Sequence, residues 1–163
     1  NDELIKDLTK QIISFGGKPN LDQSDQKLLL KNLTKQLETL SIKLILNDKT
    51  KNQIKDDEIK GIKIRFQNVV GLPPKELRKL VDNGKKDLGE GIVVVFASKD
   101  DKVGVAVGIT DKLTSKFDAV KFVKLGSEII DGQGGGGRKD FAQAGGQNQS
   151  KINEAFEKIK SLI

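Results

Sequence analysis

Residues 92–109 read IVVVFASKDDKVGVAVGI. The first part is a continuous apolar run from Ile92 to Phe96, which is typical of a strand that is buried on both faces. A polar turn follows, and after it valine and isoleucine alternate with glycine and alanine. One face of this second strand therefore carries only Gly104, Ala106 and Gly108, which are small enough for a helix or a ligand to approach closely. The hairpin predicts the centre of a sheet.

The residues before this hairpin predict a strand and a helix. Residues 62–67 alternate apolar side chains with basic or polar ones, which indicates a half-buried strand whose outer face carries Lys63 and Arg65. Pro73 and Pro74 suit the first turn of a helix, and Asn83-Gly84 predicts its end. Further helical spacing over residues 119–130 and 152–162 predicts two more helices.

The N-terminal part of the chain predicts helices only. Residues 2–15 have helical spacing and end at Gly16-Gly17, and a second helix should begin near Asp22 or Ser24 and run to about Lys55. Its leucines repeat at spacings of three and four, which indicates a narrow coiled-coil seam. Two interpretations stay open, a homodimer through this seam and an intramolecular helical hairpin. The seam consists of Leu30, Leu33, Leu37, Leu40 and Leu44.

These elements together predict an α+β fold. We expect residues 1–58 to form a helical, coiled-coil-like subdomain that acts as a linker or in dimerisation. Residues 59–163 should form a globular α/β subdomain with a mixed sheet flanked by helices.

Composition excludes many kinds of site. The chain of 163 residues has no His and no Cys, which removes the usual general base of acyl transfer and the thiolate and imidazole metal ligands. Residues 59–163 hold nineteen Lys or Arg against thirteen acidic residues, whereas residues 1–58 hold ten of each. The uneven placement of the net charge of +6 favours a polyanionic partner. The alternative is a Lys-rich surface that only keeps the protein soluble. The sequence contains no run of about 18 apolar residues, so it predicts no membrane span. The absence of Met suggests that the chain is a fragment.

Residues 132–146 read GQGGGGRKDFAQAGG and contain seven glycines, so we expect a glycine-rich loop over this range. Consecutive glycines can direct several backbone N–H groups at one anion, and an adjacent guanidinium and ammonium match phosphate. A flexible loop is the alternative. The spacing of Gly132, Gly134 and Gly137 fits a dinucleotide fingerprint only formally, because the segment follows a predicted helix instead of a strand. The candidate contacts for phosphate or ribose are Gly134, Gly135, Gly136, Gly137, Arg138, Lys139 and Gln143, and Lys63 and Arg65 would extend this basic surface.

The glycine run, Arg138, Asp140, residues 142–146 and the closing helix together resemble the C-terminal domain of bacterial alanyl-tRNA synthetases. Lys139 and Phe141 stand where that family usually has Pro and often Met, and the run is one glycine longer. A related domain ends phosphoesterases of the Asp-His-His family, where it helps to hold single-stranded nucleic acid. That role is one alternative, and a coiled-coil interaction domain is another.

The resemblance implies a domain that binds the elbow of tRNA(Ala) and couples aminoacylation to the editing of mischarged tRNA. It implies no catalytic residue, metal or cofactor in this chain, whereas the parent synthetase would use ATP with Mg²⁺ and a zinc ion in its catalytic and editing domains. Those domains and tRNA(Ala) are the expected partners, and a second copy of the chain would be a partner if the leucine seam forms a homodimer. The resemblance also implies a cytoplasmic protein without a membrane partner.

Overall fold

The computed structural model describes residues 2–163, and the chain divides into two compact units between Asp48 and Lys49. The first unit is a helical hairpin made of α1 (Asp2–Ser14) and α2 (Gln26–Asn47). Asp25 caps α2 by accepting a hydrogen bond from the backbone N–H of Lys27 at 2.9 Å. Ile12 of α1 and Leu33 of α2 are fully buried where the two helices pack.

The predicted long helix ends eight residues early, because the chain turns into a strand. Residues Asn52–Ile59 form β1, which pairs antiparallel with β2 (Ile62–Val70). Six of the eight β1 residues are exposed, so no apolar alternation marks this strand in the sequence. The division of the chain therefore falls after Asp48 instead of near residue 58.

The second unit is built on a six-stranded sheet of order β1-β2-β3-β4-β6-β5. Strands β3 (Ile92–Lys99) and β4 (Lys102–Ile109) form the predicted hairpin at its centre. Only β2 and β3 pair in parallel, because α3 (Leu77–Leu88) carries the chain across the sheet between them. The predicted α+β fold with a mixed sheet flanked by helices is confirmed.

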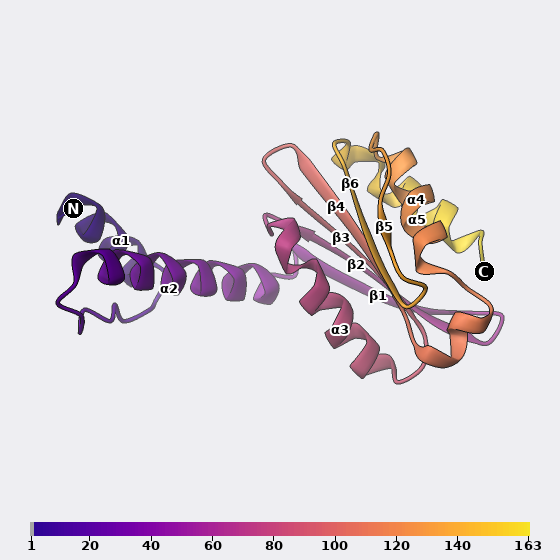
Figure 1. The fold of residues 1–163 in the computed structure, drawn as a ribbon, viewed down its shortest axis with the longest axis horizontal. Helices are drawn as coiled ribbons and strands as arrows, with labels where there is room; N and C mark the ends of the chain where they lie inside the picture. The colour runs from indigo at the N-terminus through magenta and orange to yellow at the C-terminus, as the bar shows by residue number, and fades with distance from the viewer. Residues whose placement is uncertain (1) are drawn as a thin grey trace. The chain divides into compact units, whose positions relative to one another are not determined.

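One face of the sheet packs against α3, as Figure 1 shows. A Cβ added at Gly104 would lie 2.8 Å from Leu77 Cδ1, so the glycine face of β4 is what lets the helix approach. The predicted stop at Gly84 is wrong, because the helix continues to Leu88 and Gly89 ends it. Glycine is needed at this helical position because α3 packs closely on β3, and a Cβ at Gly84 would lie 2.8 Å from Val93 Cγ1.

The opposite face packs against α4 (Ala119–Ile129) and α5 (Ile152–Lys160), and a large hydrophobic cluster lies there. Phe156 of α5 stacks on Phe66 of β2 with ring centroids 4.0 Å apart. Three short 3₁₀ helices connect these elements, η1 (Pro74–Glu76), η2 (Asp111–Ser115) and η3 (Gln149–Lys151).

Candidate nucleic-acid interface

The glycine-rich segment forms a two-stranded ribbon at the edge of the sheet. Strand β5 (Gly136–Gly137) pairs with β6 (Phe141–Gly146), and β6 pairs with β4. The expectation of a loop over the whole of residues 132–146 is therefore wrong for residues 141–146, which are a strand because they pair along β4. Residues 133–137 are all exposed, and β5 is the edge strand of the sheet (Figure 1).

Two glycines of the ribbon are required by its own geometry. Gly137 has φ 147°, and a Cβ there would lie 2.7 Å from Ala142 Cα. Gly135 has φ 110°, and its Cβ would lie 2.6 Å from Ala144 Cβ. Gly134 and Gly136 differ, because a Cβ at either would have no neighbour within 4 Å. These two positions leave backbone open toward solvent, where a ligand could approach it closely.

The turn between β5 and β6 holds Arg138 and Lys139 at the surface. The Arg138 N–H donates to Phe141 O at 2.8 Å, which closes the turn. Ile109 N–H donates to Asp140 O at 2.8 Å and Ala119 N–H donates to Lys139 O at 3.0 Å, so β4 and α4 both anchor it. The Arg138 side chain is 69% exposed, and its Nε lies 3.5 Å from Asp140 Oδ1. An exposed ion pair of this length leaves the guanidinium able to bind a phosphate.

Gln143 lies on the other side of the ribbon from Lys139. Its side chain lines a groove of about 630 Å³ between α3 and β6, whose walls also carry Arg78 and Lys102. The Arg78 guanidinium carbon lies 4.6 Å from the centroid of the Phe141 ring, a cation–π distance. These two cations could not be predicted from the sequence, because only the tertiary fold brings them into the same groove as Gln143. Lys139 instead lines a separate pocket near α4.

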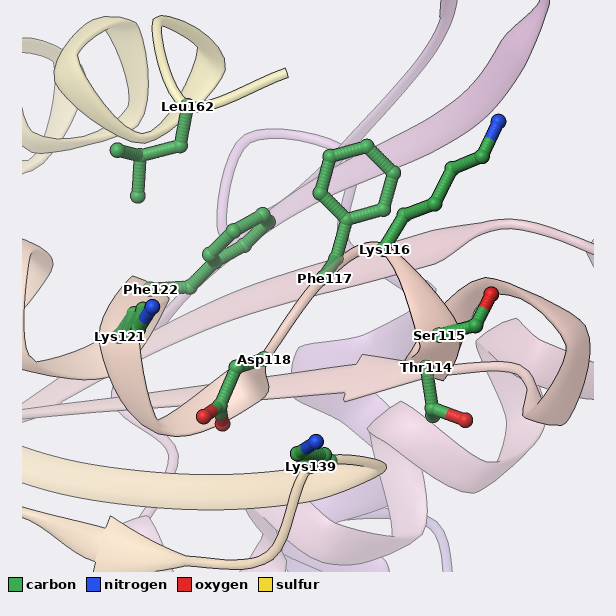
Figure 2. Close-up of a pocket in the computed structure, with 9 residues that line it drawn as sticks. All are labelled: Thr114, Ser115, Lys116, Phe117, Asp118, Lys121, Phe122, Lys139 and Leu162. Carbon is green, nitrogen blue, oxygen red and sulfur yellow. The ribbon is translucent and has the colours of Figure 1, made fainter.

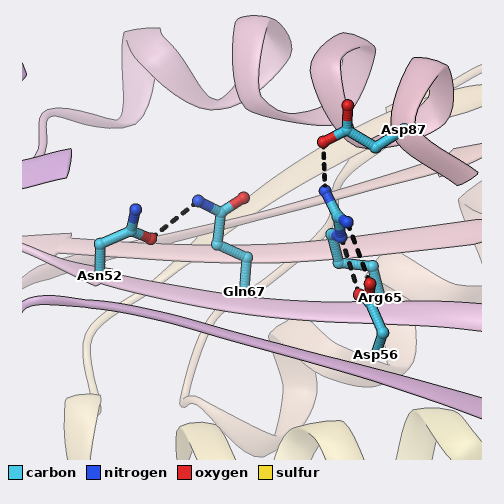
Figure 3. A network of polar contacts seen from close by, with 5 residues as sticks. All are labelled: Asn52, Asp56, Arg65, Gln67 and Asp87. Atoms are coloured by element: carbon cyan, nitrogen blue, oxygen red, sulfur yellow. Dashed lines mark hydrogen bonds and ion pairs between the residues drawn. The ribbon is translucent and has the colours of Figure 1, made fainter. Parts of the chain in front are cut away.

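Arg65 lies apart from this surface, in the network that Figure 3 shows. Its guanidinium donates to both Asp56 carboxylate oxygens, at 2.8 and 3.0 Å, and to Asp87 at 2.7 Å. These carboxylates raise the pKa of Arg65, and the Arg65 hydrogen bond lowers the pKa of Asp56. The Arg65 side chain is only 13% exposed, which favours a structural role. Lys63 is exposed and pairs in register with Glu58 of β1.

The comparisons with known proteins identify the family. The family model described as DHHA1 domain matches residues 61–163, which is more than half of the chain. The chain belongs to the DHHA1 domain family. Its similarity to the C-terminal domain of alanyl-tRNA synthetases, expected from the residues, is confirmed.

Relatives of this DHHA1 domain are alanine–tRNA ligases. The chain is 46% identical over 107 residues to that of Parvibaculum lavamentivorans and 46% identical over 105 residues to that of Hyphomonas neptunium. These matches cover 65% and 64% of the chain but only 12% of either relative. The C-Ala domain of Aquifex aeolicus alanyl-tRNA synthetase has a similar structure, with a TM-score of 0.62, 27% identity and coverage of 66% of this chain and 96% of that one.

Two further properties of the DHHA1 domain follow from residues 2–163. No group of three or more Asp or Glu side chains within them is arranged to hold a metal ion. None of their helices is both long enough and apolar enough to cross a membrane.

Two positions depart from the family pattern. Lys139 is an exposed residue of the turn, and the Phe141 ring is 8% exposed and lies beneath Arg78.

Proposed function

We propose that this DHHA1 domain binds tRNA at the elbow and, within an alanyl-tRNA synthetase, couples aminoacylation of tRNA(Ala) to editing. The observation that carries the proposal is the exposed glycine backbone of β5 beside Arg138 and Lys139. Exposed N–H groups with neighbouring cations suit a phosphate backbone. The second unit, residues 49–163, carries all of the net charge of +6, which adds long-range attraction for RNA.

The proposed contact surface follows the ribbon on both sides. Gly134–Gly137 would lie against the sugar–phosphate chain, with Arg138 and Lys139 on phosphate groups. Gln143 would reach ribose or a base edge from the groove beside Arg78. Lys63 stays a candidate at the margin, whereas the two carboxylates that hold Arg65 argue against its contacting RNA.

Salt-dependent binding tests this proposal. Labelled tRNA(Ala), another tRNA and single-stranded DNA are titrated with the chain at several salt concentrations, using fluorescence anisotropy. We expect folded tRNA to bind more tightly than single-stranded DNA, and Arg138→Ala to reduce the slope of log affinity against log salt by about 0.7–0.9. Arg78→Ala serves as a comparison on the Gln143 side. Preference for single-stranded DNA would instead support a role like that of the Asp-His-His phosphoesterases, and an unchanged slope would remove Arg138 from the interface.

The whole protein would then be an alanine–tRNA ligase, and the chemistry would lie in its other domains. The chain spans about 12% of its alanine–tRNA ligase relatives, so ATP with Mg²⁺ and a zinc ion would act outside it. Within the chain no His or Cys is available for such steps. We propose that the domain itself binds without catalysing, that the catalytic and editing domains are its partners, and that it works in the cytoplasm.

We further propose that the helical unit forms a homodimer. Leu33 of the predicted seam is used inside the hairpin, where it is fully buried, but Leu44 is 46% exposed. Exposed apolar side chains gather in this unit, and such surface favours association. They are Leu4, Ile13, Phe15, Leu21, Leu28 and Leu44.

A further inference from the structure

A separate pocket lies between η2 and α4, with the 138–140 turn along one side. Its volume is about 380 Å³, within the range of pockets that hold small ligands. Thr114, Lys116 and Phe117 line it from the η2 side, and Lys121 and Phe122 line it from α4 (Figure 2). Lys139 from the turn and Leu162 also reach it.

Phe117 is the unusual side chain in this pocket. The other five phenylalanines of residues 49–163 are at most 8% exposed, whereas Phe117 is only half-buried. Its ring meets that of Phe122 edge to face, with centroids 6.0 Å apart and planes at 66°, so a core residue supports it. One partly open aromatic ring therefore lies in the pocket wall against a buried ring.

Three lysines line the same pocket, and Figure 2 shows Lys116 pointing away from Lys121 and Lys139. The side chains of Lys116, Lys121 and Lys139 are exposed, and in residues 2–163 none of them is in an ion pair. The one acidic residue of the pocket, Asp118, caps α4 by accepting a hydrogen bond from Val120 N–H at 3.0 Å. The pocket thus carries two more positive than negative charges.

The backbone at the start of α4 is not available to an anion. The Ala119 N–H donates to Lys139 O at 3.0 Å, and the next N–H donates to the capping Asp118. Any anion in the pocket would therefore be held by lysine ammonium groups. A ligand that uses the whole pocket needs both a flat apolar part and a negatively charged part.

We propose that this pocket binds one unstacked nucleotide, with its base on the Phe117 ring and its phosphate beside Lys121 and Lys139. The inference rests in part on the proposed tRNA binding, because Lys139 belongs both to the glycine ribbon's turn and to the pocket. Base stacking on an exposed aromatic ring is a general mode of recognising single nucleotides. A free nucleotide has the same chemistry as an unpaired nucleotide of an RNA chain.

Nuclear magnetic resonance titration of the full chain with adenosine monophosphate tests the pocket, and ribose 5-phosphate is the comparison that lacks a base. We expect saturable shifts of the amides of residues 114–122 and 139, and about tenfold tighter binding of adenosine monophosphate than of ribose 5-phosphate. Phe117→Leu should remove this tenfold difference while leaving ribose 5-phosphate binding within about twofold of wild type. The same spectra show whether the variant is folded.

Lysine variants test the phosphate part of the site. Lys121→Gln should weaken both ligands about threefold to fivefold, as expected for loss of one charge-assisted contact. Lys124→Gln is the matched control, because Lys124 is exposed on the same helix but does not line the pocket. Equal affinity for the two ligands in the wild type, or no effect of Phe117→Leu on adenosine monophosphate, would overturn the proposal.

Saturating tRNA then identifies the source of the nucleotide. Loss of the adenosine monophosphate shifts would mean that a nucleotide of the RNA fills the pocket, and their persistence would mean that a free nucleotide binds beside the RNA. Anisotropy on the same samples measures tRNA binding independently. If tRNA binds but adenosine monophosphate causes no shifts in the chain without tRNA, this inference alone is refuted. If adenosine monophosphate binds in the pocket but tRNA does not bind the chain, the proposed function alone is refuted.

Discussion

Alanine substitutions at two neighbouring glycines separate the folding of the ribbon from its binding of RNA. Gly137→Ala places a methyl group at φ 147° and 2.7 Å from Ala142 Cα. A side chain held in such a backbone conformation costs about 1–3 kcal/mol. The Arg138 N–H that bonds to Phe141 O should then lose about fivefold to 150-fold of its protection from hydrogen exchange, because β5 detaches more often.

Gly136→Ala should behave in the opposite way. Its φ is not positive and its Cβ would have no neighbour within 4 Å, so Arg138 protection should stay within about twofold of wild type. If RNA lies against this backbone, the added methyl group separates the two surfaces, and loss of one central contact of about 1.4 kcal/mol corresponds to tenfold weaker tRNA binding. Hydrogen exchange and anisotropy on both variants measure the two effects. Wild-type tRNA affinity in folded Gly136→Ala would refute the argument that the glycine backbone is the contact.

Three further predictions concern stability and assembly. Arg65→Gln should cost about 1 kcal/mol in urea unfolding at pH 7, since the carboxylates it binds are half exposed. Because Arg65 lowers the pKa of Asp56 below 3.8, this stabilisation is present above pH 4 and is lost as the pH falls through the folded-state pKa, so the difference from wild type should shrink there. Ser127→Ala should cost about 1 kcal/mol, because the buried Ser127 hydroxyl donates to Gly145 O at 2.7 Å; an unchanged midpoint would contradict this. In sedimentation, the wild type should be a dimer and Leu44→Lys a monomer, and a monomeric wild type would end the dimer proposal.

The sequence predicted the elements whose pattern reflects burial. The β3–β4 hairpin was evident because every β3 residue except Lys99 is buried, and such strands read as continuous apolar runs. Strand β1 was missed because its exposed residues have no alternation. Strand β6 was missed because Ala142, Ala144 and two glycines have weak strand propensity, and pairing with β4 is what makes them a strand.

The candidate site, like the fold, could be predicted from the sequence only in part. Exposure of the glycine backbone and of Arg138 is what contact with an anion requires, and that contact stays a prediction. The separation of Gln143 from Lys139 was not predictable, because it depends on which side of the ribbon faces α3. The Phe117 pocket was equally hidden, since its lysines come from three segments that only the tertiary fold brings together.

The shortness of β5 bears on how the protein behaves at high concentration. An open sheet edge with unpaired N–H and C=O groups can recruit a strand from another molecule and start a fibril. Here that edge is two residues long, which is too short to template a stable addition, while the β1 edge carries the charged run Lys55–Glu58. The domain can therefore expose backbone N–H and C=O groups to a nucleic acid without providing a sheet edge to which strands of other molecules add.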